Sequence, residues 1–459
     1  MGTHSHSHNW KSRGVIRFQF LICFWVVLPV GDAQEIKHVI DVAPVWSGHP
    51  VGFHSLVASN HQFIAFYDAD RRMTVAARHL SATNWNFVHL PERVGWDSHN
   101  YITMALDKNG HLHLSGNMHG NPLVYFRSEQ PLEITTLKRI PGMTGQDEQR
   151  TTYPKFFEDA RGELVFTYRT GGSGNGNQIY NVYEAPTRAW RRLLDQPLLD
   201  GKGQKSAYLN GPLRGPDGYF HLTWIWRETP DCATSHHVCY ARSRDLIHWE
   251  TSGGNPLRLP MTFETGEVVD PVPLYGGAIN GNVALGFDAQ QRPIVSYHKF
   301  DTNGFTQVYN ARLESGEWKS HQATDWTYRW EFSGGGSIEF EVRVGAVTRN
   351  AEGQIEQRLS NRHHGSGTWV LDDQSLKIVK RAVVKPQYPS SLGKPVSTFP
   401  GMQVHLRPVI GDSRLWLRWE TLGANRDRPR TEPLPSATRL QVYEIAPAAP
   451  DADAVRNDP

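Results

Sequence analysis

Hydrophobic and polar residues alternate along most of the chain in short runs, and this is the period of a β-strand. Residues 101–107 (YITMALD) and 111–118 (HLHLSGNM) show the pattern clearly, with the turn residues Lys108-Asn109-Gly110 between them. These two runs predict a β-hairpin. We find no convincing helical pattern longer than two turns, so the chain is expected to be all-β.

The hairpin unit recurs, each time as two alternating runs around a turn that contains Gly, Asp or Asn. Its seven copies occupy residues 54–68, 101–119, 153–169, 208–227, 280–300, 338–358 and 403–420. A second, weaker pair of strands follows several copies. Four strands per repeat are typical of a propeller blade. The sequence therefore predicts a seven-bladed β-propeller with four antiparallel strands per blade. A β-sandwich pair or a β-helix is the alternative, and sandwiches do not repeat this unit seven times.

Composition adds to the β signal and limits the classes of partner. The 459 residues include 41 Gly, 29 Pro and 15 Trp, and the formal net charge is +2. So small a charge gives no global field that would recruit nucleic acid or a membrane surface. We expect an anionic partner to be bound locally, and no protein partner is implied.

The two ends of the chain differ from the repeats. Residues 1–33 predict a signal peptide, because basic residues precede an apolar run and small residues precede a cleavage point after Ala33. The leading HSHSH is either a non-native addition or an upstream start. Residues 447–459 are rich in Ala, Pro and Asp and predict a disordered tail. We therefore expect a secreted protein with a single propeller domain over residues 34–446.

Candidate chemistry lies at the hairpin ends opposite the turns. Positions equally distant from a hairpin turn face each other across the two strands. This rule predicts three facing pairs: His99 with His119, Tyr153 with Arg169, and Tyr208 with Arg227. Each residue alone is more often structural. Their recurrence in three successive repeats, whose ends converge near a propeller axis, indicates a shared functional site.

Such a set suits proton abstraction beside a carboxylate. Arginine or histidine offsets the charge of a uronate carboxylate and stabilises the developing enolate. A tyrosine becomes usable as a base when a neighbouring cation favours the phenolate, and Tyr153 facing Arg169 predicts this arrangement. The same tyrosine or a histidine can protonate the leaving group. The predicted outcome is β-elimination across C4–C5 of the uronate.

Two other classes of function stay open. Glycoside hydrolysis usually needs two carboxylates, and only Asp97 and Asp301 are candidates. A sialidase-like hydrolase would instead use a tyrosine nucleophile with Arg169, Arg227 and Arg329 around the carboxylate of the substrate. The other class is a non-catalytic propeller that binds glycans.

Three blocks of sequence carry a resemblance to a known family. They are WDSHNYITMALDKNGHLHLSGNMHGNPLVYFRS, TTYPKFFEDARGELVFTYRTGGSGNG and FHLTWIWRETPDCATSHHVCYARSRDLIHW. They resemble the BNR-repeat-containing secreted proteins that include the propeller-type ulvan lyases, over about residues 45–345. The resemblance implies a polysaccharide lyase that cleaves an anionic, uronate-containing and ulvan-like sulfated polysaccharide by β-elimination.

The resemblance also implies roles for single residues. The expected catalytic residues are Tyr153, His99, His119 and Arg169. The expected substrate contacts are Arg227, Tyr208, Asn100, Asn121 and His298. His298 is included because it lies eight residues past its turn, at the height of the site. Catalysis is expected to need no cofactor.

A second cluster indicates either a metal or a disulfide. Residues 232–239 contain two cysteines and two histidines. Thiolate and imidazole ligands suit a structural zinc, with the expected ligands Cys232, His237, Cys239 and His221. A disulfide between Cys232 and Cys239 is the alternative, because a secreted protein meets an oxidising compartment. The resemblance slightly favours zinc.

Overall fold

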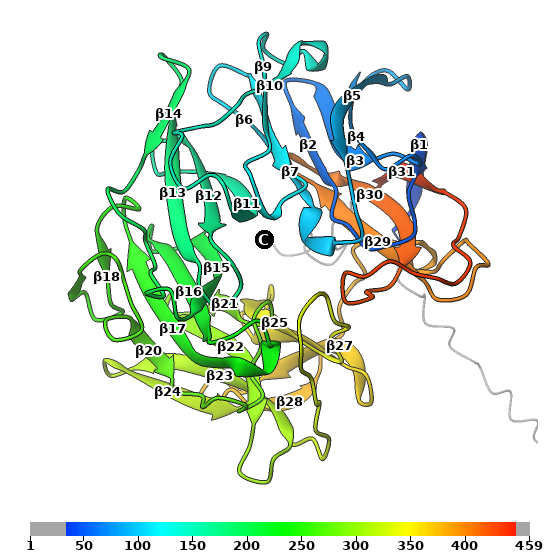
Figure 1. Cartoon of the computed structure of the whole chain (residues 1–459). Helices are drawn as coiled ribbons and strands as arrows, with labels where there is room; N and C mark the ends of the chain where they lie inside the picture. The colour runs from blue at the N-terminus through cyan, green and yellow to red at the C-terminus, as the bar shows by residue number, and fades with distance from the viewer. Residues whose placement is uncertain (1–33, 447–459) are drawn as a thin grey trace, which may run out of the picture. The chain divides into compact units, whose positions relative to one another are not determined.

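The computed structural model describes residues 34–446, which form seven antiparallel sheets. The sheets follow one another around a central axis, with the chain passing from blue to red as it goes round (Figure 1). Five sheets have four strands, one has five and one has six. The predicted seven-bladed β-propeller is therefore confirmed. The predicted signal peptide and the predicted tail lie outside the described residues.

Each predicted hairpin forms two neighbouring strands of one blade, and we number the blades in chain order. Blade 1 contains β2 (His54–Ala58), β3 (His61–Tyr67), β4 (Arg72–His79) and β5 (Asn86–Arg93). Blade 2 contains β6 (Ile102–Leu106), β7 (Leu112–Gly116), β9 (Tyr125–Ser128) and β10 (Leu137–Arg139). Blade 3 contains β8 (His119–Asn121), β11 (Thr151–Glu158), β12 (Leu164–Thr170), β13 (Asn177–Glu184) and β14 (Ala189–Arg192).

The remaining blades follow the same plan. Blade 4 contains β15 (Ser206–Arg214), β16 (Phe220–Arg227), β17 (Ser235–Ser243), β18 (Trp249–Glu250), β19 (Pro256–Leu257) and β20 (Glu267–Asp270). Blade 5 contains β21 (Ala284–Phe287), β22 (Pro293–Phe300), β23 (Thr306–Glu314) and β24 (Glu317–Gln322). Blade 6 contains β25 (Val342–Arg349), β26 (Ile355–Asn361), β27 (Gly365–Leu371) and β28 (Ile378–Arg381).

Blade 7 joins the two ends of the described chain. It contains β29 (Met402–Val409), β30 (Asp412–Leu422), β31 (Thr438–Ile445) and β1 (Ile36–Val45). The first strand lies antiparallel to the last, with Val45 opposite Thr438 and Ile36 opposite Ile445. This pairing closes the ring, because one blade is built from both ends of the chain.

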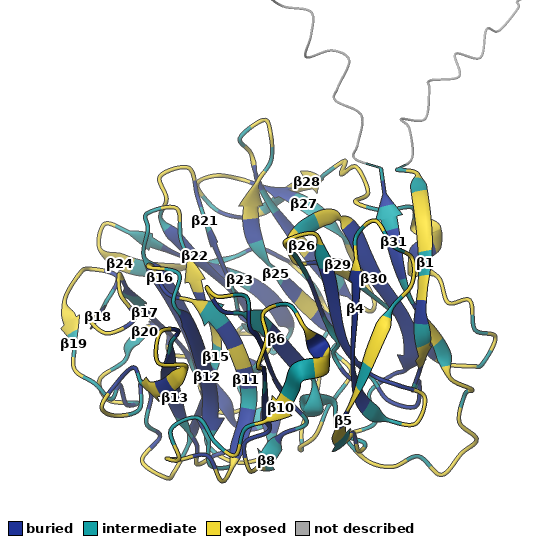
Figure 2. Ribbon diagram, turned by 90° about the horizontal axis from the view of Figure 1, so that it is seen from above, coloured by how far each residue is buried: buried dark blue, intermediate teal, exposed yellow. Residues whose placement is uncertain are grey.

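Apolar side chains pack between neighbouring blades. Phe66 of blade 1, for example, shares a buried cluster with Trp419 of blade 7. Figure 2 shows the result: buried positions fill the inner parts of the sheets, whereas outlying strands such as β1 and β5 are largely exposed. Inner strands such as β3 and β16 are buried on both faces, because each blade packs between two neighbours.

Helical structure is confined to four short 3-10 turns in the described residues. They are η1 (Ser98–Asn100), η2 (Ile134–Thr136), η3 (Cys232–Thr234) and η4 (Ser390–Gly393). Within residues 34–446, no helix has the length and apolar character to span a membrane.

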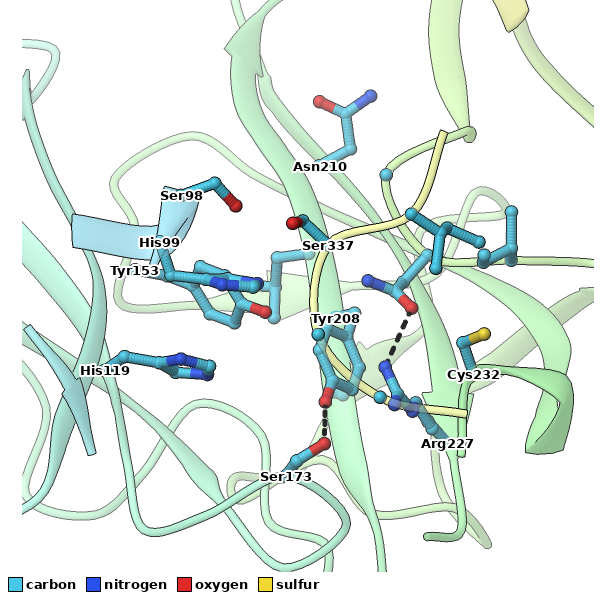
Figure 3. A pocket seen from close by; sticks show the side chains of 18 of the residues that line it. Ser98, His99, His119, Tyr153, Ser173, Tyr208, Asn210, Arg227, Cys232 and Ser337 are labelled. Atoms are coloured by element: carbon cyan, nitrogen blue, oxygen red, sulfur yellow. Dashed lines mark hydrogen bonds between the residues drawn. The ribbon is translucent and has the colours of Figure 1, made fainter. Parts of the chain in front are cut away.

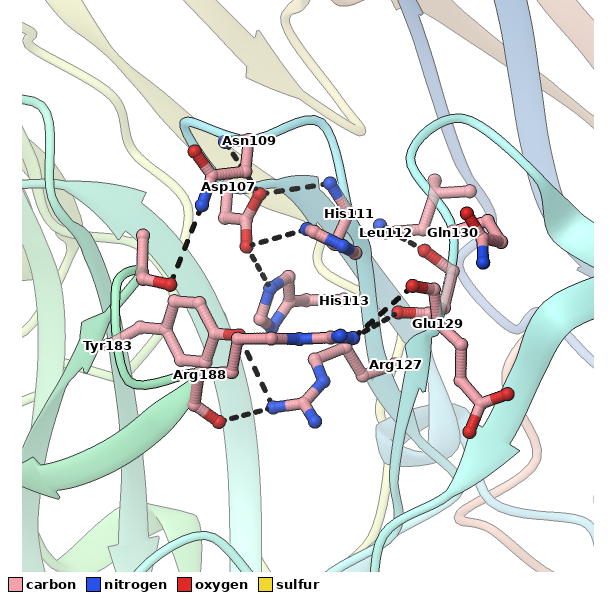
Figure 4. Close-up of polar contacts among 12 residues, drawn as sticks. Asp107, Asn109, His111, Leu112, His113, Arg127, Glu129, Gln130, Tyr183 and Arg188 are labelled. Atoms are coloured by element: carbon pink, nitrogen blue, oxygen red, sulfur yellow. Dashed lines mark hydrogen bonds and ion pairs between the residues drawn. The ribbon is translucent and has the colours of Figure 1, made fainter.

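A polar network joins blades 2 and 3 at the turn end of the β6–β7 hairpin (Figure 4). His113 is fully buried, and its ring nitrogens contact the Tyr125 hydroxyl at 2.8 Å and the Asp107 carboxylate at 3.4 Å. Arg127 donates across the blade boundary to the Arg188 carbonyl at 2.6 Å. Buried polar groups are costly unless they are hydrogen-bonded, so this network fixes the two blades in register.

Candidate active site

A cavity of about 690 Å³ brings together side chains from different blades. Five of the predicted catalytic and substrate-binding residues line it: His99, His119, Tyr153, Tyr208 and Arg227. In Figure 3 the two histidines and Tyr153 lie on one side, Arg227 lies on the other, and Tyr208 lies between them. The structure thus gathers most of the predicted site.

His99 and His119 meet as predicted, although strand pairing does not hold them. The β6–β7 ladder ends at Ile102 and Gly116, so both histidines lie beyond it. His99 belongs to η1, and His119 begins β8, which pairs with β11 of the next blade. The two imidazole rings stack with centroids 4.1 Å apart.

Asp97 lies between the two histidines and binds both. Its Oδ1 is 2.8 Å from Nδ1 of His99, and its Oδ2 is 2.5 Å from Nδ1 of His119. Burial alone would raise the pKa of Asp97, but the hydrogen bonds from His119 and His99 hold that pKa well below its usual range. Asp97 therefore stays ionised, and Nε2 of each histidine is left without a protein partner in the described part of the chain.

His99 carries a positive charge at neutral pH. Burial would lower the pKa of His99, but hydrogen bonds and charges from Asp427 and Asp97 outweigh it and raise the pKa to about 9. The Nδ1 atom of His99 is 3.3 Å from Oδ2 of Asp427. Two carboxylates thus hold one imidazolium at the cavity wall.

Tyr153 lies in a β-bulge of β11 at a left-handed φ of 59°. Thr152 pairs with Arg169 and Lys155 pairs with Thr167, so Tyr153 is one of two residues opposite one. The predicted direct pairing of Tyr153 with Arg169 is wrong by one position for this reason. Arg169 nevertheless contacts Tyr153, with its guanidinium carbon 4.9 Å from the ring centroid.

The electrostatics of Tyr153 differ from the prediction. Burial raises the pKa of its phenol, and the neighbouring Tyr208 adds to this, while Arg169 and Arg227 oppose it. The net pKa is raised, because burial outweighs the opposing effect of the two arginines. Tyr153 is therefore protonated when the cavity is empty.

Arg169 is a buried cation behind the cavity wall. It is 2% exposed, and its Nε and Nη1 atoms have no hydrogen-bond partner within residues 34–446. Its Nη2 donates to the Thr152 hydroxyl at 3.3 Å, and the guanidinium also lies 5.5 Å from the Tyr208 ring. Two aromatic faces thus take the place of a carboxylate partner.

Tyr208 and Arg227 also meet out of register. Tyr208 pairs with Ile225, and Arg227 pairs with Ser206, so the predicted facing pair is wrong by two residues. They still contact diagonally, with the Arg227 guanidinium 5.3 Å from the Tyr208 ring. The Tyr208 hydroxyl is hydrogen-bonded to Ser173 Oγ at 2.6 Å.

Oxygen atoms hold Arg227 in place without cancelling its charge. Its guanidinium donates to the carbonyls of Thr229 and Pro230 and to Asn280 Oδ1, the last at 3.3 Å. All three acceptors are neutral. Arg227 therefore presents a net positive charge at the cavity wall.

Three predicted substrate contacts do not line the cavity: Asn100, Asn121 and His298. The Asn100 carbonyl accepts hydrogen bonds from Tyr67 and Asn117, and the Asn121 side chain accepts from the His119 backbone N–H. His298 is 1% exposed beside Trp330, and burial lowers its pKa to about 3. These residues support the fold around the site.

The structure does not bring together the predicted zinc ligands Cys232, His237, Cys239 and His221. Both ring nitrogens of His221 are occupied, by the Tyr240 hydroxyl at 2.6 Å and by Asp217 Oδ1 at 2.9 Å. Cys232 lines the large cavity, whereas Cys239 is buried in β17 opposite Trp224. The predicted ligand set does not fit a zinc ion. The alternative disulfide is also wrong, because both cysteines are free.

Asp97, His99 and His119 are close enough together to bind a metal ion, and they are the only such group in the described residues. However, Asp97 hydrogen-bonds to Nδ1 of both rings. This geometry is that of a carboxylate shared by two histidines, so we describe it as an ion-pair cluster.

Several residues of the site were not predicted. Asp427 reaches His99 from the loop between β30 and β31, and the cavity is further lined by Lys155, Ser173, Asn280, Ser337 and Arg343. Ser173 lies in the Gly-rich segment 171–176, whose composition signals a loop. Asp427 lies outside every hairpin repeat, so no periodic signal could have placed it at the site.

The amino-acid sequence of this chain is similar to a known family and to known proteins. A family model described as a BNR repeat-containing family member matches residues 61–326. The short isoform of ulvan lyase from Alteromonas sp. (strain LOR) is 25% identical over 225 residues, covering 43% of this chain and 41% of the relative. A long isoform from Pseudoalteromonas sp. (strain PLSV) is 36% identical over 75 residues, covering 14% of this chain and 8% of the relative. The chain thus matches less than half the length of these relatives.

Solved structures with the same fold include two lyases. The polysaccharide lyase Uly1 superposes with a TM-score of 0.57 at 16% identity, covering 89% of this chain and 99% of that one. A PL25 ulvan lyase superposes with a TM-score of 0.55 at 14% identity, covering 85% and 97% of the two chains. At this level of identity the likeness shows a shared fold.

Proposed function

The chain belongs to the BNR repeat-containing family, and on this premise we propose that it is a polysaccharide lyase. The proposed substrate is an anionic, uronate-containing polysaccharide of the ulvan type, cleaved by β-elimination at C4–C5 of the uronate. The similarity to ulvan lyases supports this class. The observation that carries the proposal is a cavity whose lining, within residues 34–446, includes the cation Arg227 and no carboxylate.

The cations suit the first requirement of β-elimination. Abstraction of the C5 proton places negative charge on the uronate carboxylate, and fixed cations in a cavity stabilise that charge. Arg227 has only neutral acceptors among the described residues. Arg169 adds a second positive charge behind Tyr153 and Tyr208, whereas the charge of His99 is balanced by Asp97 and Asp427. A uronate carboxylate would complete this set.

Tyr153 is the proposed proton-transfer group. As the phenolate it removes the C5 proton; the C4–O bond then breaks, C4=C5 forms, and the phenol returns the proton to the leaving oxygen. Arg169 and Arg227 favour the phenolate, although burial raises the pKa of the phenol. The reactive form is thus the minor one in the free enzyme. His119 and His99 assist transfer and position the uronate.

The hydrolase alternatives fit the cavity less well. Hydrolysis by the usual route needs two carboxylates flanking the glycosidic bond, and both acids near the cavity, Asp97 and Asp427, are bound to histidines. Arg329, the third arginine of the sialidase-like alternative, pairs with exposed Glu331 and does not line the cavity. Asp301 caps its own turn by accepting from Asn303 and Phe305.

Absorbance distinguishes the three classes. A lyase acting on ulvan creates a C4=C5 double bond that absorbs in the ultraviolet, a hydrolase creates reducing ends without that absorbance, and a binding module does neither. We expect the absorbance to grow with the wild-type protein. New reducing ends without absorbance would overturn the proposal.

Tyr153→Phe tests the proposed role of the hydroxyl. We expect kcat/KM to fall by roughly 10²- to 10⁴-fold, the range for loss of a general acid or base. The melting temperature should stay close to that of the wild type, because no hydrogen bond of this hydroxyl occurs in the described residues. Tyr275→Phe, at a tyrosine that is 63% exposed, is the control. Near-normal activity of Tyr153→Phe would contradict the mechanism.

Secretion is part of the same proposal. A polymer of this kind is met outside the cell, and the basic and apolar pattern of residues 11–33 supports export.

A further inference from the structure

Asp427 lies in the loop between β30 and β31 and has a left-handed φ of 56°. Its carboxylate accepts from the backbone N–H and the hydroxyl of Ser98, each at 3.1 Å, and from the Ser337 N–H at 2.8 Å. It also contacts Nδ1 of His99 at 3.3 Å and Nε2 of His49 at 3.2 Å. One side chain of blade 7 thus binds three other segments of the chain.

One of these segments forms a wall of the cavity. Residues 335–337 line the cavity (Figure 3 shows Ser337 beside it). The segment is held from one side by Asp231, which accepts from the Gly334 N–H at 2.6 Å. From the other side, Arg426 donates to the Ser333 carbonyl at 2.8 Å and its N–H donates to the Ser337 carbonyl at 2.9 Å. Asp427 completes this second attachment.

The attachment of residues 333–337 to Arg426 and Asp427 lies between blades 6 and 7, where apolar packing is weak. Buried apolar clusters join blades 1 to 3, blades 3 and 4, blades 4 and 5, blades 5 and 6, and blades 7 and 1. Among the described residues, no such cluster joins the strands of blade 6 to those of blade 7. The position of the 333–337 segment relative to His99 therefore depends on polar contacts, in which Asp427 is central.

We infer that Asp427 is a positioning residue of the active site, which fixes His99 and the 333–337 wall in one geometry. The inference rests on the proposed function and deepens it. Asp427 does not line the cavity, so it acts through His99 and Ser337.

The contact between Asp427 and His99 also affects the pH dependence of the site. The groups that face His99 are Asp97, Asp427, His119 and Tyr153. The two carboxylates raise the pKa of His99 to about 9 against the opposing effect of burial. The imidazolium is thus present below that pH and lost as pH rises through it. Removing the Asp427 charge should move this loss to lower pH.

Asp427→Asn keeps the shape of the side chain and removes its charge. We expect kcat/KM to fall by roughly 10- to 100-fold, as for a small misplacement of a catalytic group. The alkaline limb of the kcat/KM profile should move down by about one pH unit or more. Asp427→Glu keeps the charge and should retain the wild-type limb with a smaller loss of activity. Asp288→Asn is the control, because Asp288 is a buried carboxylate that caps the β21–β22 turn through Arg292.

Nuclear magnetic resonance separates this inference from the proposed function. The titration of His99, assigned with a His99→Gln variant, is followed in the wild type, in Asp427→Asn and in Asp427→Glu. A lower midpoint in Asp427→Asn alone supports the inference, even if the wild type cleaves no uronate polymer and the proposed function fails. An unchanged midpoint together with activity within twofold of the wild type would overturn it. If Asp427→Asn does not fold, as judged by circular dichroism, Asp427→Ser removes the same charge and decides: a lower His99 midpoint supports the inference, and a wild-type midpoint overturns it.

Discussion

Arg169 is buried behind two tyrosines with two of its three guanidinium nitrogens unpaired in the described residues. A buried charge without a counter-ion is costly, and stacking on two aromatic rings returns only part of that cost. Arg169 occurs beside the group proposed to become a phenolate. We infer that the charge is retained for chemistry, at the expense of stability.

Arg169→Met separates these two effects. We expect kcat/KM to fall by at least about 100-fold, because a cation favouring the phenolate is lost. The free energy of unfolding should stay the same or rise by about 1 to 4 kcal/mol, since an apolar side chain of similar length replaces a buried charge. Denaturant unfolding and the absorbance assay measure the two quantities.

Arg161→Met is the matched control, because Arg161 lies at the exposed turn of the same hairpin and its side chain is 69% exposed. It should change neither quantity appreciably. A large loss of stability in Arg169→Met without loss of activity would show that Arg169 is structural.

At the scale of residues, the site residues that belong to the hairpin repeats were predictable from the sequence, and those outside the repeats were not. His99, His119, Tyr153, Tyr208 and Arg227 are predicted to lie together because each is at the end of a hairpin opposite its turn, and all five line the cavity. Asp427 was missed, because a long loop with no repeat brings it to the site from a distant part of the chain. The zinc prediction failed because closeness in sequence does not fix the direction of side chains on a strand.

At the scale of elements, β-bulges shape the cavity. The ladders of β11 with β12, β15 with β16, and β25 with β26 each have two residues opposite one. In β11 the extra residue is at Tyr153-Pro154, and Tyr153 lines the cavity. Alternation of apolar residues does not reveal a bulge, so the hairpins were predictable but the exact register near the site was not.

The 333–337 segment is the second element that shapes the cavity, and Gly336 tests its placement. Gly336 has a φ of 74°, and an added Cβ would lie 2.3 Å from the backbone oxygen of Arg426. Gly336→Ala should therefore displace the wall and reduce kcat/KM by roughly 10-fold or more. The absorbance assay with ulvan measures this effect.

Gly218→Ala is the control for backbone strain. Gly218 has a similar φ of 81° in the β15–β16 turn, and no atom of residues 34–446 lies within 4 Å of the added Cβ. We expect it to lose about 1 to 2 kcal/mol of stability, the cost of a left-handed alanine, with unchanged activity. Equal kcat/KM values of Gly336→Ala and Gly218→Ala would show that the position of residues 333–337 does not affect catalysis.

At the scale of the whole molecule, the ring is closed by β1 pairing with β31. The seven repeats made the number of blades predictable from sequence. The composition of the closing blade was less obvious, because β1 precedes the first hairpin and only the fold reveals its partner. The stability of the propeller should depend on this junction.

Two valines of β1 provide a matched test of closure. Val45 is fully buried, whereas Val39 is 49% exposed. Val45→Ala should lower the free energy of unfolding by roughly 2 kcal/mol, since it removes two buried methyl groups and leaves a cavity. Val39→Ala should change it by less than about 0.5 kcal/mol. Similar changes in the free energy of unfolding in Val45→Ala and Val39→Ala would show that the pairing of β1 with β31 contributes little to stability.

The contact between Asp427 and the 98–99 turn also orders events during synthesis. Asp427 and Ser98 are 329 residues apart in the chain. A ribosome adding about 5 to 20 residues per second needs on the order of tens of seconds to make the intervening chain. The early blades can fold during that time, but the histidines acquire their full electrostatic surroundings only when the last blade emerges. The nascent chain should thus be inactive until synthesis is nearly complete, even where most of its blades are already formed.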